Sequence, residues 1–237
     1  MRERSSRLHF EWFSLPLADL KAAARRVDGK VNDAFLTAVA IGLRRYHEAH
    51  GASAEALRVN MPINLRTDSS GVGGNNWAPS RFPVPLGGED VDQHMRDIHD
   101  LVVRQRAEPA LQFAGTLAAV LDQLPASLLT EVFTGMLTCL DFAATNVAGA
   151  PFPLYLAGAR MESMLAFAPP GGAALNVSLL SYLDTAFIGL NVDPVAVPDT
   201  ATLLACMRDG FETVVHPRAA RPRSPRSRGR VAHAASR

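Results

Sequence analysis

The sequence predicts an α/β protein of the α+β sandwich kind, in which a mixed or mostly antiparallel sheet is flanked by helices. Three observations support this fold class. Leu57–Leu65 alternates apolar and polar residues with the period of two expected of a strand that has one buried face. The segment from Asn32 onward carries apolar residues at helical spacing. Strand-like and helix-like segments are mixed along the chain, which favours a sheet covered by helices.

The first 51 residues are expected to form one strand and two helices. Leu8–Phe13 alternates apolar and polar residues and is predicted to be a strand. Ser14 and Pro16 are a helix-start signal, so Leu17–Val27 is predicted to be an amphipathic helix. A second helix is predicted to have Asn32 as its N-cap, with Asp33 at the positive end of the helix dipole. Its apolar face comprises Ala34, Phe35, Ala38, Val39, Gly42, Leu43 and Tyr46, and Gly51 ends it.

The middle of the chain is expected to contain a strand pair followed by three helices. Leu57–Leu65 and Trp77–Pro85 are the predicted strands, joined by a turn-rich loop at Gly71–Asn76. Prolines restrict the second strand to a sheet edge or to strand ends. The predicted helices are Asp90–Ala107, Pro109–Leu121 and Pro125–Leu140.

The last third is expected to return to strands and to close with a helix. The predicted strands are Phe142–Val147, Leu154–Leu156, Arg160–Phe167, Ala174–Tyr182 and Ala186–Val192. Asp199–Val215 is predicted to be an amphipathic helix with Leu203, Leu204, Met207 and Phe211 facing inward. From His216 onward Pro, Arg, Ser and Ala replace core-forming residues, so we expect one domain over 8–215 and a disordered tail over 216–237.

The charge is distributed unevenly. The whole chain has a formal net charge of +1, yet residues 218–237 contain seven arginines and no acidic residue. The rest of the chain is therefore mildly acidic. The abrupt change at His216 resembles read-through of a GC-rich gene in a wrong frame, and we expect a truncated or split gene product.

No signal-peptide pattern is visible, because Met1–Arg7 is charged and no apolar region follows it. The longest uncharged run, Ser163–Leu183, is broken by Pro169–Gly172, which argues against a transmembrane helix. We expect a cytoplasmic protein whose contact with the inner membrane face or lipid droplets, if any, is peripheral. Cys139 and Cys206 are expected to be core thiols of a reducing compartment.

Common catalytic motifs are absent. His94 and His99 are five residues apart, which places them about 140° apart around a helix, so they cannot share a metal ion. His47 and His50 lack the spacing of a zinc protease motif. We expect these histidines to be solvated helix residues, and we expect no metal site. No Gly-x-Ser-x-Gly motif or phosphate-binding loop is present either.

Several motifs, in order along the chain, resemble those of bacterial wax ester synthases/diacylglycerol acyltransferases. The segments that carry the resemblance are Val31–Leu36 (VNDAFL), Leu57–Arg66 (LRVNMPINLR), Gly74–Pro79 (GNNWAP), Asp141–Pro151 (DFAATNVAGAP), Leu175–Tyr182 (LNVSLLSY) and Phe187–Asp193 (FIGLNVD). They are similar to the C-terminal half of this family. Ala148 and Ala150 stand where the family has prolines.

The resemblance implies one lobe of the chloramphenicol-acetyltransferase-like acyltransferase fold. In that fold two lobes enclose a tunnel, with acyl-CoA as substrate and no cofactor. A His-His-x-x-x-Asp-Gly motif in the N-terminal lobe supplies the general base. No two histidines are adjacent in this chain, so the family's catalytic motif is missing. We therefore expect no catalytic residue here and expect inactivity without an N-terminal lobe in cis or trans.

The resemblance also suggests six substrate-binding candidates. They are Asn32, Asp33, Thr145, Asn146, Asn176 and Ser181. Each has a structural alternative. For Asn32 and Asp33, helix capping is preferred to direct substrate contact. Thr145 and Asn146 are explained by turn stabilisation as well as by oxyanion support. Asn176, Ser178 and Ser181 are explained by cross-strand hydrogen bonds as well as by a place at the tunnel edge.

Three classes of function remain open on these grounds. The first is one lobe of an enzyme that transfers an acyl group from acyl-CoA to diacylglycerol or a lipid alcohol. The second is a non-catalytic remnant or lipid-binding module. The third, a nucleic-acid-binding protein, rests only on the basic tail, and we expect no nucleic-acid partner.

Overall fold

The computed structural model describes residues 4–64, 77–88, 90–108 and 140–217. Its elements are β1 (His9–Pro16), α1 (Leu17–Arg25), α2 (Val31–Ala49), β2 (Ala56–Asn64), β3 (Trp77–Pro85), α3 (Val91–Arg106), β4 (Phe142–Ala148), β5 (Tyr155–Leu156), β6 (Ala159–Arg160), β7 (Leu175–Tyr182), β8 (Thr185–Val192) and α7 (Thr200–Val215). Several predicted features lie outside the described residues: the loop at 71–76, the helix over 109–121, the helix from 125 as far as residue 139, the tail from 218 onward, and Cys139.

Six strands form one mixed sheet in the order β1-β8-β7-β4-β2-β3. β4 runs parallel to both of its neighbours, and the other pairs are antiparallel. The predicted mixed sheet is confirmed. The position of β3 at the sheet edge is also confirmed, which suits its prolines, since proline cannot donate a ladder hydrogen bond.

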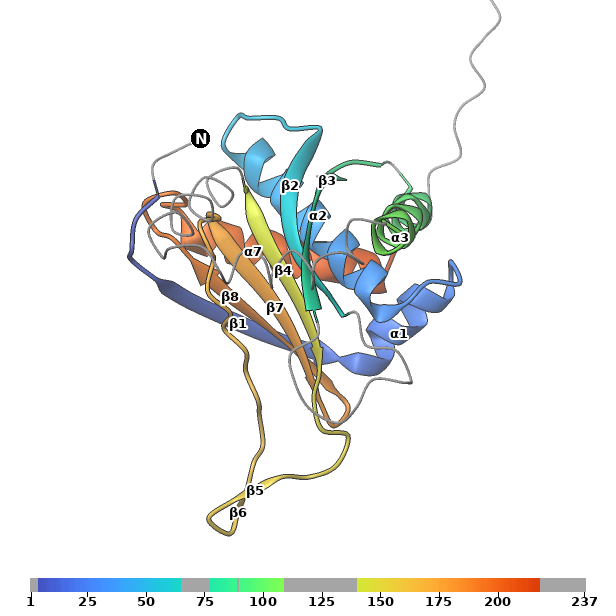
Figure 1. Ribbon diagram of the computed structural model, residues 1–237. Coiled ribbons are helices and arrows are strands. Elements are labelled where there is room, and N and C mark those ends of the chain that lie inside the picture. The colour runs from blue at the N-terminus through green and yellow to red at the C-terminus, as the bar shows by residue number, and fades with distance from the viewer. Residues whose placement is uncertain (1–3, 65–76, 89, 109–139, 218–237) are drawn as a thin grey trace, which may run out of the picture.

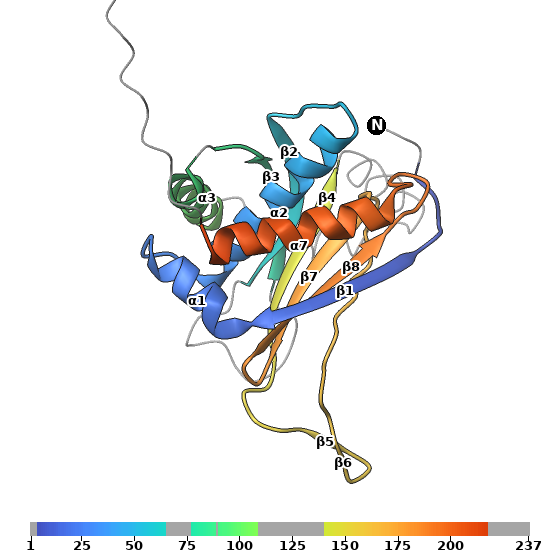
Figure 2. The ribbon, with the colours of Figure 1, turned by 180° about the vertical axis from the view of Figure 1, so that it is seen from behind.

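Helices α2 and α7 cover one face of the sheet, which we call the helix face (Figures 1 and 2). Alternate strand residues point into this layer and are buried there, in keeping with the strand period of two. They include Val59, Met61, Phe142, Ala144, Leu175, Val177, Leu179, Ile188 and Leu190. The sequence predicted that α2 buries one apolar face. In the structure, every residue of α2 from Asp33 to Leu43 is buried.

The opposite face, which we call the open face, is crossed by residues 166–170, a segment we call the strap. The Asn176 Nδ2 donates to Pro169 O at 3.3 Å, and the Asn191 Nδ2 donates to Ala168 O at 3.1 Å. Ala168 N donates to Ser178 Oγ at 3.4 Å. A strand over Arg160–Phe167 was expected and is wrong, because only its first residue belongs to a strand. The strap is held by side chains, and no backbone ladder forms there.

Helix ends follow the expected chemistry with one exception. Asp90 and Asp199 are N-caps whose carboxylates accept backbone N–H groups of the first turn of α3 and α7. Gly51 has the positive φ of 67° that suits the residue after a helix. The prediction of Asn32 as the N-cap of α2 is wrong: Lys30 is the N-cap and Asp33 is the third helical residue.

His94 of α3 is buried and only 2% exposed, so its assignment as a solvated histidine is wrong. Its Nε2 lies 2.9 Å from Pro85 O, which can only accept, so Nε2 carries the proton. The other ring nitrogen, Nδ1, is buried without a hydrogen-bond partner among the described residues. Burial lowers the pKa of His94 below its usual value, and the nearby Arg44 lowers it further, although the bond to Pro85 opposes both.

This buried histidine predicts a loss of stability in mild acid. Above the unfolded pKa of about 6.5 both states are neutral at this site. Below it the unfolded chain binds a proton that the folded chain resists, so the free energy of unfolding falls as pH decreases toward the folded pKa. Urea unfolding of the native chain and of His94→Leu at pH 7.5 and pH 5.5 tests this. The native chain should lose more stability between the two pH values than the variant, and equal losses would contradict the assignment.

Candidate functional site

Five of the six candidate residues gather at one end of the sheet, where β4 ends and α2 begins. β4 pairs with β7 in parallel, with Thr145 opposite Ser178 and Ala148 opposite Ser181. On the other side, Asn60 of β2 lies opposite Ala143 of β4. Continuing that register places Met61 beside Ala144 on the helix face. We call this end of the sheet the β4 end.

Asn32 reaches the β4 end from the first turn of α2. Its Nδ2 lies 3.8 Å from Met61 Sδ, a weak contact with a poor acceptor. Because Asn146 has the same parity along β4 as the buried Phe142 and Ala144, it also belongs to the helix face. Asn146 is exposed, since it lies beyond the part of the strand that the helices cover.

Asp33 makes a tighter set of contacts and is only 2% exposed. Its Oδ2 accepts the Lys30 N–H at 2.7 Å, as the third residue of a helix does in half of a capping box. The same oxygen lies 2.7 Å from Nδ1 of His99 on α3. The carboxylate thus fixes the start of α2 and ties α2 to α3. The capping role expected of Asp33 is confirmed, whereas its pairing with His99 was not foreseen.

The contacts of Asn32 and Asp33 predict different roles. Asp33→Ala removes the partner of a buried N–H and of His99, so we expect a loss of about 1–3 kcal/mol in unfolding free energy. Asn32→Ala removes one weak contact, so we expect a change within about 0.5 kcal/mol. Thermal or urea unfolding of both variants checks this. Equal losses of stability in the two variants would contradict this distinction between the two residues.

Ser181 and Tyr182 hold the chain where it leaves the β4 end. Gly149 N donates to Ser181 Oγ at 3.2 Å. The Tyr182 hydroxyl accepts from Leu154 N at 2.9 Å and donates to Met161 O at 3.0 Å, and Tyr182 is only 1% exposed. Sequence reasoning assigned no role to Tyr182, although an aromatic residue with a hydroxyl at the end of an apolar strand is a signal for such a bond.

Between these anchors, residues 151–160 form a hairpin that we call the arm, which projects away from the sheet (Figure 1). Its two short strands, β5 and β6, are joined by Ala157 and Gly158, both of which have positive φ, as a tight hairpin turn requires. Its large apolar side chains are unusually exposed: Phe152 at 59%, Tyr155 at 65% and Leu156 at 72%. In the sequence, the only indication of this exposed apolar hairpin is the run PFPLYL, in which prolines flank apolar residues.

Asn176 lies apart from the other candidates. It is opposite Ala143, five residues from Ser181, or roughly 17 Å along the strand. Its Oδ1 accepts from Ser178 Oγ at 2.9 Å, and its amide holds the strap. Asn176 therefore bonds to a residue of its own strand and to the strap. The cross-strand hydrogen bond expected for Asn176 is not the one that forms.

Thr145 and Asn146 make no side-chain hydrogen bond to another residue that the structure describes. The Thr145 side chain is on the open face and half-buried. Both side chains are therefore available at the β4 end, next to the start of the arm. Neutral hydroxyl and amide donors of this kind can stabilise a developing oxyanion.

The described side chains indicate neither a metal site nor a reactive cysteine. In the described ranges, no group of three or more His, Cys, Asp or Glu side chains is arranged to hold a metal ion. Burial raises the pKa of the half-buried Cys206 thiol, which disfavours the nucleophilic thiolate. No described helix is both long and apolar enough to cross a bilayer.

Solved structures of acyltransferases and condensation domains share this fold. A wax ester synthase/diacylglycerol acyltransferase from Marinobacter aquaeolei VT8 superposes with a TM-score of 0.65 and 21% identity, over 90% of this chain and 50% of that one. A condensation domain of the enacyloxin polyketide synthase gives a TM-score of 0.58 at 14% identity, over 93% of this chain and 44% of that one. At these identities the similarity shows the class of fold alone: the chain has the fold of about half of each of these proteins.

Sequence comparison then defines the family. The model of the WS/DGAT C-terminal domain matches residues 73–214, and the chain belongs to this family. A putative diacylglycerol O-acyltransferase of Mycobacterium tuberculosis H37Rv, Rv2484c, is 33% identical over 215 residues, which is 91% of this chain and 44% of that protein. The probable diacylglycerol O-acyltransferase tgs1 of the same strain is 28% identical over 210 residues, 85% of this chain and 45% of that protein. The chain thus spans less than half the length of these relatives.

Proposed function

We propose that the chain is the C-terminal lobe of an acyl-CoA-dependent diacylglycerol O-acyltransferase or wax ester synthase. It would contribute to transfer of an acyl group from acyl-CoA to diacylglycerol or a long-chain alcohol. The observation that carries this proposal is the match of 91% of the chain to a relative named as such an acyltransferase. No cofactor is required, because the thioester already activates the acyl group.

The general base would come from the N-terminal lobe, in cis or in trans. This chain contains no His-His-x-x-x-Asp-Gly sequence. A base in the partner lobe would remove the proton of the acceptor hydroxyl as its oxygen attacks the thioester carbonyl. The tetrahedral oxyanion would then collapse, with release of the CoA thiol.

The role of this lobe in that reaction would be to position the substrates and to stabilise charge. At the β4 end Thr145 presents a neutral donor on the open face and Asn146 presents one on the helix face, where Asn32 lies at the start of α2. The positive end of the α2 dipole faces the same region. We propose that these three side chains contact substrate there, whereas Asp33, Ser181 and Asn176 hold the surrounding backbone.

The arm and the adjoining part of the open face would dock against the N-terminal lobe. The open face carries further exposed apolar side chains: Val147 of β4 at 43%, and Phe10 and Trp12 of β1 at 50% and 47%. Extended apolar surface of this kind marks an interaction site. Because the chain matches less than half the length of each of these relatives, their N-terminal part is the partner best suited to cover it.

A chimera tests the proposed function. The matching part of Rv2484c would be replaced by this chain, leaving the relative's N-terminal half intact. We expect acyl transfer from palmitoyl-CoA to diacylglycerol or hexadecanol, and we expect alanine at the second histidine of His-His-x-x-x-Asp-Gly to abolish it. A folded chimera that forms neither triacylglycerol nor wax ester, under conditions where Rv2484c itself does, would overturn the proposal.

A further inference from the structure

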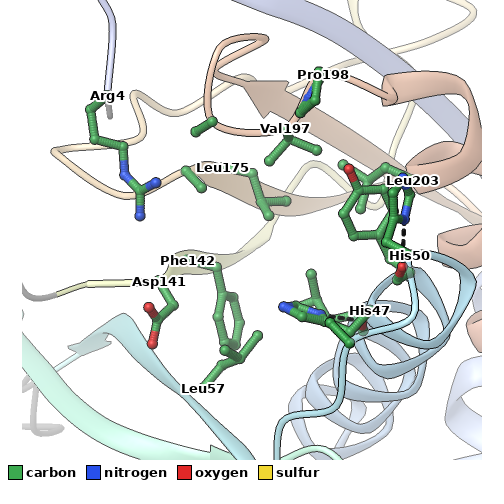
Figure 3. A pocket seen from close by; sticks show the side chains of 15 residues that line it. Arg4, His47, His50, Leu57, Asp141, Phe142, Leu175, Val197, Pro198 and Leu203 are labelled. Carbon is green, nitrogen blue, oxygen red and sulfur yellow. Dashed lines mark hydrogen bonds between the residues drawn. The ribbon is translucent and has the colours of Figure 1, made fainter. Parts of the chain in front are cut away.

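A half-open cavity of about 330 Å³ lies at the end of the sheet opposite to the arm (Figure 3). It is enclosed by the last turns of α2, the first residues of β4 and β7, and the segment that leads into α7. Much of its wall is apolar and includes Leu43, Leu57, Phe142, Leu175, Val197 and Leu203. None of the six candidate site residues lines it, so the cavity is separate from the β4 end.

Arg4 brings a positive charge to one wall of this cavity. Its Nε donates to Gly172 O and its Nη2 donates to Leu140 O, both at 3.3 Å. Both acceptors are uncharged carbonyl oxygens, so these two bonds orient the guanidinium without neutralising it. Guanidinium groups bind carboxylates through charge-assisted and often bidentate hydrogen bonds. This wall therefore suits the carboxylate of a ligand.

Asp141 brings a negative charge to the same part of the cavity. It follows Leu140, whose carbonyl oxygen accepts from the Arg4 guanidinium, and Figure 3 shows both charged groups on one side of the cavity. Arg58, which does not line the cavity, contacts Asp141 Oδ2 through its backbone N at 2.8 Å and its Nε at 3.5 Å. Oδ1 is not used in either contact, so it can accept from a cationic donor on a ligand.

The other titratable side chains of the wall are two histidines of α2 and its C-cap, His47 and His50. Nδ1 of each ring lies 2.8 Å from the carbonyl oxygen four residues earlier, which can only accept, so Nδ1 carries the proton. Nε2 of His50 lies 3.6 Å from Asp199 Oδ2, and Asp199 does not line the cavity. Arg4 and Asp141 are thus the oppositely charged pair of the wall.

We propose that this cavity binds a free α-amino acid with an apolar side chain. The α-carboxylate accepts from Arg4, the α-ammonium donates to Asp141 Oδ1, and the side chain lies against Leu43, Phe142 and Leu175. A simple carboxylate would place an anion beside Asp141, and a simple amine would place a cation beside Arg4, and both like-charge contacts are unfavourable. A peptide terminus carries only one of the two charges, so the pair favours a free amino acid.

The size of the cavity agrees with a ligand of this class. A volume of about 330 Å³ is at the lower end of ligand cavities, about 300–1,000 Å³, which suits a single amino acid. The largely apolar wall would bury its side chain, while the two charged groups fix its orientation. The site belongs to this lobe alone, so the inference does not rest on the proposed acyl transfer.

Binding of three matched probes to the purified chain tests this site. The probes are L-phenylalanine, 3-phenylpropionate, which lacks the ammonium group, and 2-phenylethylamine, which lacks the carboxylate. Amide NMR titration should show L-phenylalanine binding with perturbations around 141–142 and 196–203. We expect it to bind at least tenfold more tightly than either analogue, because each analogue lacks one charge-assisted hydrogen bond.

Variants of the two charged residues separate their contributions. Arg4→Gln should weaken L-phenylalanine binding at least tenfold and bring it to within about twofold of 2-phenylethylamine. Asp141→Asn retains an acceptor for Arg58 N and should bring L-phenylalanine to within about twofold of 3-phenylpropionate. The matched control is Arg7→Gln, at an exposed residue of the same segment that does not line the cavity, and it should change none of the three affinities.

A native chain that binds none of the probes, or that binds 3-phenylpropionate as tightly as L-phenylalanine, would overturn the proposal. Undiminished L-phenylalanine binding by a folded Arg4→Gln protein would do the same. If a variant fails to fold, the ranking of the three probes on the native chain decides the question. Because no acyl-CoA and no N-terminal lobe are present, failure here leaves the chimera result unaffected.

Discussion

Replacing Tyr155 and Leu156 with aspartate is expected to abolish acyl transfer by the chimera with the N-terminal half of Rv2484c. These side chains are 65% and 72% exposed, so the isolated lobe loses little when they change. In the docked state they would be buried, and two charges would then be desolvated without partners, which costs several kcal/mol. We expect at least a hundredfold loss of turnover in the chimera. The measurement is product formation from palmitoyl-CoA and hexadecanol.

The matched control is Val103→Asp on α3, which introduces the same charge at a residue that is 50% exposed and far from the arm. It should leave turnover within about twofold of the parent chimera. Unfolding curves of the isolated lobe should be the same for all three proteins. Full activity in the Tyr155→Asp/Leu156→Asp variant would contradict the docking role of the arm.

Replacing Gly210 with leucine is expected to cost about 3 kcal/mol or more in unfolding free energy, at the upper end of overpacking effects. A Cβ at Gly210 of α7 would lie 2.4 Å from Ala38 O and 2.8 Å from Gly42 N of α2. Both atoms belong to backbone, which cannot move aside as a flexible side chain does. Glycine normally weakens a helix interior, so its presence at this crossing reflects the close approach of the two helices.

Ala205→Leu is the control for this prediction, because Ala205 lies on the exposed side of α7. It adds the same side chain to the same helix and should change the unfolding free energy by no more than about 0.5 kcal/mol. Urea unfolding of both variants makes the comparison. A folded Gly210→Leu protein with native stability would show that α2 and α7 pack differently from the structure described above.

Regular elements were predictable from the sequence, because burial imposes a period. The alternation in Leu57–Leu65 and the helical spacing of apolar residues in Asp90–Ala107 and Asp199–Val215 led to β2, α3 and α7 with ends displaced by no more than one residue. The strap was not predictable in the same way. It is held by amides and a hydroxyl of Asn176, Ser178 and Asn191 that bond to backbone, and such contacts leave no periodic signal in the bonded segment.

The candidate site was predictable only in part and for the same reason. Resemblance to the family indicated Asn32, Thr145 and Asn146. Thr145 and Asn146 lie near the end of β4, and the contact of Asn32 with Met61 brings the start of α2 to the same end of the sheet. Their contact with substrate remains a prediction. His99 could not be linked to Asp33 from the sequence, because 66 residues separate them and only the packing of α3 on α2 brings them together. The burial of His94 was missed because α3 is otherwise the most polar helix of the chain that the structure describes.

The direct test of the central claim is acyl transfer by this chain alone. Radiolabelled palmitoyl-CoA would be incubated with the purified chain and either diacylglycerol or hexadecanol, and the lipid products would be separated and counted. Because we propose that this lobe contributes donors and a docking surface while the base lies in a second lobe, we expect no product above the protein-free rate. Sustained turnover that depends on this chain and on no other protein would show that it contains its own proton acceptor, and it would contradict the assignment of catalysis to a second lobe.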